Sequence, residues 1–401
     1  MSTAKDTYKM YGKDDFSLEL NEDEREILNM VRDFARNEVK PRAAENDAKA
    51  EYPTDLVKQM SELGIMGLSF PEEYGGAGQS YILFALAVEE LCAACASTGL
   101  VFDVNMSLGA EPILFFGNEE QKMKWLPGMA SGKKLGALAM TEPGAGSDAA
   151  GIKTRAVRDG DSYIINGSKT FITLGSVAET YVVTAVTDPE LRAKHRHISD
   201  FVVEKGTPGL SFGQPMHKMG ITASMTTEVF FDDVRVPASN LLGQEGDGFK
   251  ITMDTLDGGR VGVAAQAIGI ARSALEDCIE YATQRKQFNT PVTEFEGIQF
   301  MLADMATAID AARLLTLRAA YLREKGIPCA RESSMAKLFA GDTAMKVATD
   351  ALQIFGGYGY IKEYPAERHM RDAKITQIYE GTQQVQRLVV ARQTLKNLVK
   401  R

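Results

Sequence analysis

Hydrophobic positions change their spacing twice along the chain. They recur with the period of a helix from residue 21 to about residue 129, then alternate with polar residues in short runs from about 135 to about 236. From residue 246 the helical period returns in four long blocks, at 246–286, 292–324, 330–356 and 366–399. The pattern predicts a helical unit, then a mainly antiparallel β unit, then a helical bundle.

These changes predict an α+β protein of three domains. We place an N-terminal helical domain at residues 1–129, a central β domain at 130–244 and a C-terminal four-helix bundle at 245–401. The central strands follow one another without intervening helices, which excludes the parallel βαβ sheet of a Rossmann-type nucleotide fold. At 401 residues the chain is long enough for several packed units.

Composition and charge narrow the class of protein. With 44% hydrophobic and 25% charged residues, the chain has the composition of a folded globular protein. Its net charge of -9 argues against a nucleic-acid partner, which requires a basic surface. The most apolar stretch, residues 81–102, contains Glu89 and Glu90 and therefore predicts a buried helix, with no membrane insertion. The first twenty residues resemble neither a signal nor a transit peptide, so we expect a cytoplasmic protein.

The four cysteines are too few and too scattered for a disulfide framework, which favours a reducing compartment. Cys92 and Cys95 form a C-x-x-C pair, but the sequence around them is typical of the small-residue face of a helix. The histidines also lack the spacing of metal ligands, so no metal is predicted.

Two glycine-rich segments are candidates for binding a flat group. A strand that begins at Leu138 leads into the loop Thr141–Ser147, where glycines would let a ligand approach the backbone. Phe171 and Thr173 follow one strand later, and an aromatic ring beside a hydroxyl suits a heterocycle, although a tight β-turn explains the loop equally well. The second segment, residues 353–360, has more glycines than a helix cap needs, which indicates close packing against a flat group or another subunit.

Glu380 is the candidate acid–base residue. It stands between Tyr379 and Gly381 in a segment that interrupts a helical region, so its carboxyl group could enter an apolar site where its pKa would rise. The residues alone, however, favour a solvated loop glutamate.

Two extended motifs, AMTEPGAGSDAAG at 139–151 and QIFGGYGYIKEYPAERHMRD at 353–372, are followed by IYEGT at 378–382. On these motifs the sequence resembles the acyl-CoA dehydrogenase family from about Phe16 to its C-terminus, and the run at 255–271 is similar to the short-chain, butyryl-CoA branch. The resemblance implies a helical domain, a β-barrel-like domain and a four-helix bundle. It also implies FAD-dependent dehydrogenation of a short-chain acyl-CoA to the trans-2-enoyl-CoA in fatty acid β-oxidation, with electrons passed to an electron-transferring flavoprotein.

The same resemblance assigns roles to individual residues. Glu380 would remove the α proton as the β hydrogen leaves as hydride to the flavin, and Gly259 occupies the position where some relatives carry the base instead. Residues implied to contact FAD within the chain are Leu138, Met140, Thr141, Gly146, Ser147, Phe171, Thr173, Thr382 and Gln384. Residues implied to reach the FAD of a neighbouring subunit, in a homotetramer built as a dimer of dimers, are Arg285, Phe288, Gln353, Phe355, Gly356 and Gly357. The substrate positions are Ser147, Asp257, Arg260 and Gly381.

Three positions bear on the substrate and on FAD contact. Gly99 stands where decarboxylating glutaryl-CoA relatives carry an arginine, which disfavours a dicarboxylic acyl group, and Glu296 replaces a glutamine that contacts FAD in most relatives. Asp103 stands near the implied acyl cavity, where short-chain relatives usually have a small neutral residue. The residues favour an outward-facing side chain at a helix start, but a carboxylate there could orient an unusual acyl group or accept a second proton. An alicyclic or branched acyl-CoA, and an acyl-CoA oxidase, therefore stay open as alternatives.

Overall fold

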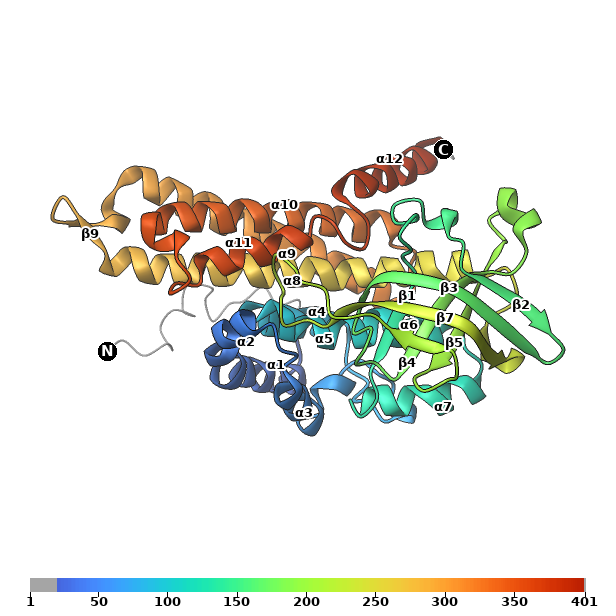
Figure 1. Cartoon of the computed structure of the whole chain (residues 1–401). Helices are drawn as coiled ribbons and strands as arrows, with labels where there is room; N and C mark the ends of the chain where they lie inside the picture. Colours follow the sequence, from blue (N-terminus) through green and yellow to red (C-terminus); the bar gives the residue numbers. More distant parts are fainter. Residues whose placement is uncertain (1–19, 400–401) are drawn as a thin grey trace.

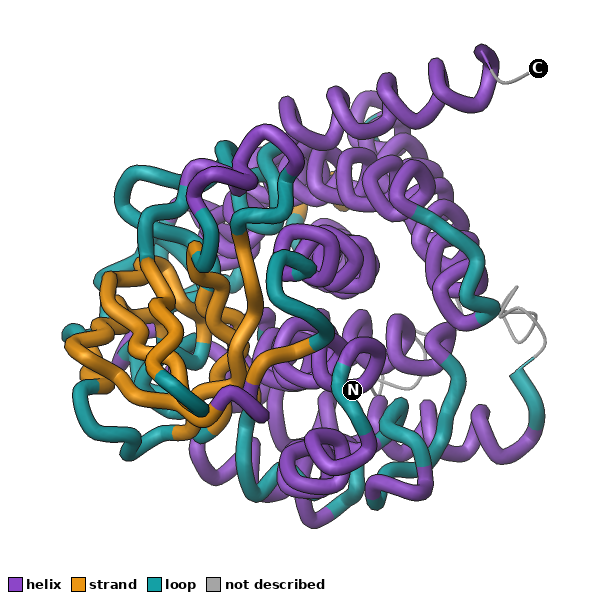
Figure 2. The backbone as a smooth tube through the Cα atoms, turned by 90° about the vertical axis from the view of Figure 1, so that its right-hand side faces the viewer, coloured by secondary structure: helices purple, strands orange, loops and turns teal. Residues whose placement is uncertain are grey.

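The chain folds into helices, a sheet and further helices, in the order that the hydrophobic pattern predicts (Figure 1). The computed structural model describes residues 20–399. The N-terminal segment that we interpret as lacking a targeting signal falls almost entirely outside the described residues. Figure 2 shows the strands gathered on one side of the molecule and the helices on the other, with the C-terminal helix projecting away.

The N-terminal helices cover one side of the molecule. They are α1 (Glu22–Phe34), α2 (Ala43–Lys49), α3 (Thr54–Glu62), α4 (Tyr81–Ala94), α5 (Ala96–Val104), α6 (Glu111–Phe116) and α7 (Glu119–Ala130). The apolar stretch 81–102 is buried as predicted, but it forms two helices, because Cys95 adopts an extended conformation between α4 and α5. Among the described residues one segment, Ala96–Phe116, is long and apolar enough to cross a membrane, yet 83% of its apolar window is buried inside the protein. Burial at that level is typical of a core helix of a folded domain.

The central unit is an eight-stranded sheet with the order β6-β7-β3-β2-β4-β5-β8, and β1 pairs with β4. The strands are β1 (Gly136–Ala139), β2 (Arg155–Asp159), β3 (Ser162–Thr173), β4 (Thr180–Val186), β5 (Ile198–Glu204), β6 (Leu210–Phe212), β7 (Thr226–Pro237) and β8 (Leu241–Leu242). Most neighbours are antiparallel, as predicted, while β4 lies parallel to β1 and, at one residue pair, to β2. Every residue of β4 is buried, which fits a strand covered on both faces.

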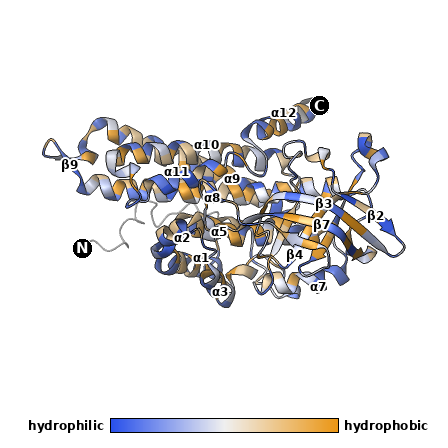
Figure 3. Ribbon diagram, viewed as in Figure 1, coloured by the Kyte–Doolittle hydropathy of each residue, from blue (hydrophilic) through white to orange (hydrophobic). Residues whose placement is uncertain are grey.

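The C-terminal unit is helical. Its helices are α8 (Gly248–Gln284), α9 (Glu296–Glu324), α10 (Ala330–Phe355), α11 (Ala366–Ile375) and α12 (Gln383–Val399), and the short hairpin of β9 (Lys286–Gln287) and β10 (Thr290–Pro291) joins α8 to α9. The block predicted at 366–399 forms two helices, because the segment 376–382, which includes the interruption predicted around Glu380, separates α11 from α12. Figure 3 shows hydrophobic and hydrophilic residues side by side along α12.

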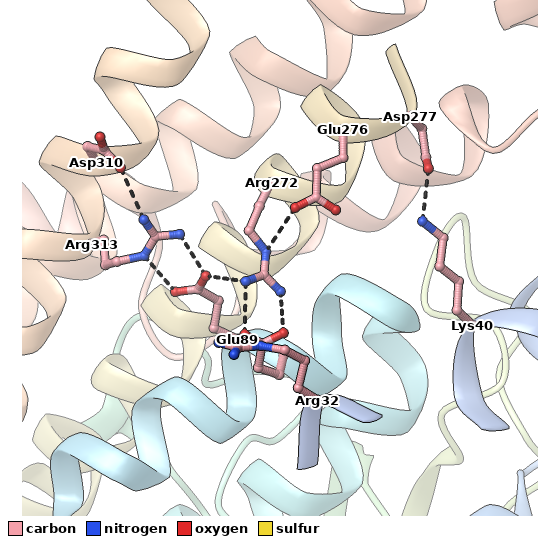
Figure 4. A network of polar contacts seen from close by, with 9 residues as sticks. Arg32, Lys40, Glu89, Arg272, Glu276, Asp277, Asp310 and Arg313 are labelled. Atoms are coloured by element: carbon pink, nitrogen blue, oxygen red, sulfur yellow. Dashed lines mark hydrogen bonds and ion pairs between the residues drawn. The ribbon is translucent and has the colours of Figure 1, made fainter. Parts of the chain in front are cut away.

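A buried ionic network fixes the N-terminal helices against the bundle (Figure 4). Arg272 of α8 contacts Glu90 of α4 at 2.7 Å, and Arg313 of α9 contacts Glu89 of α4 at 2.7 Å. Arg32 of α1 also donates to Glu90. Since buried charges are tolerated only when they are paired, the network specifies how α4, and α5 after it, lie against α8.

Candidate active site

Glu380 lies in the segment between α11 and α12, and its backbone has the left-handed conformation, with φ of 52°. Lys337 of α10 donates to the carbonyl oxygen of Gly381 at 2.7 Å, and the Gln386 side chain donates to the carbonyl oxygens of Glu380 and Gly381 at 3.0 Å. A non-glycine residue keeps such a conformation only where its surroundings hold it. Lys337 and Gln386 therefore fix the position of Glu380, and the sequence pattern did not single out either residue.

The Glu380 carboxyl group points onto α8 at Gly259. A Cβ atom at Gly259 would lie 2.2 Å from Glu380 Oε2, so a side chain there would displace the carboxyl group. Glu380 Oε2 is buried and has no hydrogen-bond partner among the described residues. Burial, followed by the nearby Asp103 carboxyl group, raises the pKa of Glu380 to about 8. The solvated loop glutamate that the residues alone favour is therefore wrong.

Asp103 is on α5, and its carboxyl group lies against the same face of α8 as the carboxyl group of Glu380. The prediction that Asp103 faces outward at a helix start is therefore wrong. Asp103 is completely buried near the end of α5, where the side chain faces α8 rather than solvent. The Ser107 hydroxyl donates to Asp103 Oδ1 at 2.9 Å, whereas Oδ2 has no partner among the described residues. A Cβ atom at Gly262 would lie 1.9 Å from Oδ1. Burial raises the pKa of Asp103 to about 7.

Glycines of α8 thus make room for carboxyl groups on one face of the helix. Gly259 lies beneath Glu380 and Gly262 beneath Asp103. Since residues i and i+3 of a helix have Cβ positions roughly 5–6 Å apart, the two carboxyl groups are near neighbours. The glycines in the run 255–271 are a sequence signal for a helix face that other groups approach closely. The sequence does not show which groups approach it, because they come from α5 and from the segment after α11.

Two further predicted substrate residues lie on α8 beside the Glu380 segment. Asp257 and Arg260 form an ion pair at 2.5 Å, and the positive charge of Arg260 counteracts part of the rise in the pKa of Glu380. Burial raises the pKa of Asp257 to about 6. Gly99 packs against Cys92, because a Cβ atom there would lie 2.3 Å from the Cys92 sulfur. The α5–α4 contact therefore has no room for an arginine at position 99.

The predicted loop and the Phe171 segment meet at the end of the sheet. The N–H of Thr170 donates to the carbonyl oxygen of Thr141 at 2.8 Å, which places the two segments side by side. Glu142 holds the loop by pairing with buried Lys169 at 2.9 Å. Ser147 is exposed on this loop, while Leu138, Met140 and Thr173 are half-buried around it.

This region fits the flat ring of FAD. Phe171 is 68% exposed and has the left-handed backbone conformation, with φ of 58°. A Cβ atom at Gly144 or Gly146 would meet no other atom within 4 Å, so the backbone is open to a ligand there. An exposed aromatic ring, half-buried apolar side chains and accessible backbone are features that a flavin ring can cover.

The other predicted FAD residues gather at the opposite end of the bundle, near the β9 hairpin (Figure 1). Phe355 stacks on Tyr281 with ring centroids 4.3 Å apart, and Phe288 is 93% exposed. The other members of this group, all exposed, are Arg285, Gln353, Gly356 and Gly357. Within one chain these residues lie far from the Phe171 region. This separation is expected if they contact the FAD of a second subunit.

Thr382 and Gln384, also predicted to contact FAD, lie at the start of α12. The Thr382 hydroxyl accepts a hydrogen bond from the N–H of Val385 at 3.3 Å, and Gln384 is exposed. Thr382 therefore begins α12 in the described chain.

Three models of acyl-CoA dehydrogenase domains match the sequence. The N-terminal domain model matches residues 21–133, the middle domain model 137–234 and the C-terminal domain model 246–395. The chain therefore belongs to the acyl-CoA dehydrogenase family, whose enzymes are FAD-dependent oxidoreductases that act on a CH–CH bond.

Individual relatives define the similarity more closely. The chain is 50% identical to the short-chain specific acyl-CoA dehydrogenase of Clostridium acetobutylicum, over 93% of this chain and 98% of that protein. The structure of butyryl-CoA dehydrogenase from Megasphaera elsdenii is 48% identical, with a TM-score of 0.91 and coverage of 94% and 99%. A chain in the structure of the electron transferring flavoprotein of Acidaminococcus fermentans is 51% identical, with a TM-score of 0.92 and coverage of 94% and 98%.

Proposed function

We propose that the protein oxidises a short-chain acyl-CoA to the trans-2-enoyl-CoA with FAD and passes the electrons to an electron-transferring flavoprotein. Similarity to short-chain and butyryl-CoA dehydrogenases over nearly the whole chain supports the substrate class. The similar chain in an electron transferring flavoprotein structure supports the partner.

The observation that carries the proposal is the buried, unpartnered carboxyl oxygen of Glu380, held by a fixed segment above Gly259. In this environment the carboxylate is a stronger base than one in water, as removal of a proton from the α carbon requires. Lys337 and Gln386 hold the segment through its backbone carbonyl oxygens, which fixes the direction of the Glu380 carboxyl group. FAD, when bound, supplies the acceptor for the β hydrogen and its two electrons.

We assign the substrate and flavin contacts in the same way. Ser147, Asp257, Arg260 and Gly381 contact the acyl-CoA, and the backbone N–H of Glu380 donates to the thioester carbonyl. Residues that contact the flavin of their own subunit are Leu138, Met140, Thr141, Gly146, Ser147, Phe171, Thr173, Thr382 and Gln384. Residues that reach the flavin of a neighbouring subunit in the homotetramer are Arg285, Phe288, Gln353, Phe355, Gly356 and Gly357.

Asp103 favours a second candidate substrate. The supporting observation is that the Asp103 carboxyl group is completely buried near Glu380, so that an acyl group wider or longer than butyryl would extend toward it. We therefore keep an alicyclic or branched acyl-CoA beside butyryl-CoA. The domain limits 1–129, 130–244 and 245–401 and the cytoplasmic location stay predictions.

An anaerobic titration tests the proposal. The purified flavoprotein is mixed with straight, branched, dicarboxylic and cyclic acyl-CoAs, and flavin absorbance is followed. We expect bleaching with short straight or compact cyclic acyl-CoAs and little with glutaryl-CoA. A protein without flavin, or one that no acyl-CoA bleaches, would contradict the proposal, and peroxide formation as fast as turnover with an artificial acceptor would indicate an oxidase.

A further inference from the structure

Asp103 is a buried acidic group that the proposed reaction does not use. Its side chain is completely buried, and Ser107 donates to one of its two carboxyl oxygens. The other, Oδ2, has no hydrogen-bond partner among the described residues. Leaving a buried polar atom unsatisfied costs about 1–3 kcal/mol, so such an atom calls for an explanation.

The unpartnered oxygen of Asp103 belongs to a carboxyl group that neighbours Glu380, the proposed base. Asp103 faces Gly262 and Glu380 faces Gly259, so no α8 side chain stands beneath either carboxyl group. The Cβ positions of residues i and i+3 on a helix are about 5–6 Å apart, so carboxyl groups that lie against Gly259 and Gly262 are neighbours, and the Asp103 charge acts on Glu380. A compact acyl group whose α carbon touches Glu380 would therefore bring its more distant carbons to Asp103.

A straight butyryl chain cannot satisfy Asp103, because its distal hydrogens are neither hydrogen-bond donors nor acidic. Neighbouring side chains in the described part of the chain do not donate a hydrogen bond to Asp103 Oδ2 either. Cys92 is buried nearby with the pKa of its thiol raised by burial, and Tyr379 donates its hydroxyl to Gln266. Among the described residues, none donates to Asp103 Oδ2, so this oxygen can accept a hydrogen from a bound acyl group.

We propose that Asp103 is a second substrate-contacting carboxyl group, which selects acyl-CoAs that direct a hydrogen at Oδ2. That hydrogen belongs either to a hydroxyl substituent or to an acidic C–H further from the thioester than the α carbon. In the second case, for an α,β-unsaturated acyl group, the γ C–H bond breaks. The proton goes to the Asp103 carboxylate, and the electron pair stays in the substrate as the conjugated enolate. The inference rests on the proposed function, because it assumes that the acyl group lies against Glu380.

Binding is measured first, in the Glu380→Gln background, where turnover does not interfere. Titrations of flavin absorbance give the Kd of butyryl-CoA and of 4-hydroxybutyryl-CoA. Adding Asp103→Asn should weaken hydroxylated acyl-CoA binding at least about 10-fold and change butyryl-CoA binding less than about 2-fold. Asp200→Asn is the matched control, since Asp200 is also a buried aspartate with one unpartnered oxygen but lies on β5 in the sheet.

Proton transfer is measured second, by NMR in D₂O with crotonyl-CoA and with a cyclohexene-carbonyl-CoA. The Glu380→Gln variant should still exchange a γ hydrogen, and Asp103→Asn in that background should abolish the exchange. The proposal is supported if Asp103→Asn selectively weakens the binding of hydroxylated acyl-CoAs or abolishes γ-hydrogen exchange. Asp103→Ser should give the same result. Equal effects on every acyl-CoA, or no effect in either measurement, would overturn it. Wild-type bleaching by butyryl-CoA is recorded alongside, so that failure of this inference is distinguishable from failure of the proposed function.

Discussion

At the scale of single residues, the environment of Glu380 shows what the sequence can and cannot predict. Resemblance of residues 378–382 to a family motif identified Glu380, whereas its local neighbours predicted a solvated side chain. Its carboxyl group lies against Gly259 of α8, and its pKa is raised further by Asp103 of α5, and both residues are distant in sequence. The burial of Asp103 was not predicted either, because tertiary packing decides which side chains of a helix are buried.

The carboxyl pair predicts a pH dependence of catalysis. The pKa of Glu380 is raised to about 8, and only the ionised carboxylate accepts a proton. We therefore expect kcat/KM to fall as the pH decreases below about 8. Replacing Asp103 by Asn removes a nearby negative charge, so this decline should shift to lower pH. Profiles measured on both proteins check this, and coincident profiles would show that the two groups do not interact.

The same pair predicts a pH dependence of stability. Asp103 has a pKa of about 7 in the folded protein against 3.8 for an ordinary aspartate. A raised pKa favours the folded state fully below the unfolded pKa, and this contribution is lost as the pH rises through the folded pKa. Asp103→Asn should therefore increase the free energy of unfolding at pH 8 by about 1–3 kcal/mol, with a smaller gain at pH 5. Denaturant unfolding at both pH values measures it, and a gain that does not change with pH would be inconsistent with this explanation.

At the scale of elements, the hydrophobic pattern predicted where helices and strands lie but not where they break. The stretch 81–102 appears continuous in hydropathy, yet Cys95 divides it into α4 and α5. The block 366–399 divides at the segment 376–382, where the residues around Glu380 did predict an interruption. At the second break the carbonyl oxygens of Glu380 and Gly381 accept hydrogen bonds from Lys337 and Gln386, and such contacts leave no periodic signal.

The close contact of α8 with Glu380 gives a test at this scale. Gly259→Ala adds a Cβ atom 2.2 Å from Glu380 Oε2, so the carboxyl group must move and kcat should fall at least about 100-fold. Gly297→Ala, at the second residue of α9, is the control, because its Cβ atom meets nothing within 4 Å and kcat should therefore stay unchanged. Steady-state rates of the two variants decide it. Full activity of Gly259→Ala would mean that the Glu380 position matters little.

The ionic network gives a second test. Arg272→Met removes the cation that contacts Glu89 and Glu90, and should cost about 3–5 kcal/mol because carboxylates are left in a buried site. Lys346→Ala removes one end of an exposed pair with Asp350 and should cost less than about 0.5 kcal/mol. Urea unfolding of both flavin-loaded variants compares them. A loss no larger for Arg272→Met than for Lys346→Ala would contradict a role for the network in joining the helices.

At the scale of the whole molecule, the order of helical, β and helical units followed from periodicity alone. The parallel pairing of β1 with β4 did not, since alternation does not reveal which strands are neighbours. The two groups of predicted flavin residues lie at opposite ends of one chain, as expected if one group contacts the flavin of a second copy. Leu388 and Leu395 of α12 are 55% and 61% exposed, as expected for a helix that packs in a homo-oligomer.

The most direct measurement compares wild type with Glu380→Gln in an anaerobic titration with butyryl-CoA and with a cyclic acyl-CoA. Wild type should bleach, while the variant should keep its FAD absorbance and bleach about 10²–10⁴-fold more slowly, because an amide does not accept the α proton. The flavin content of both proteins is measured first, because a variant that has lost FAD would fail to bleach whatever the role of Glu380. A flavin-loaded variant that bleaches at the wild-type rate would contradict the assignment of Glu380 as the base.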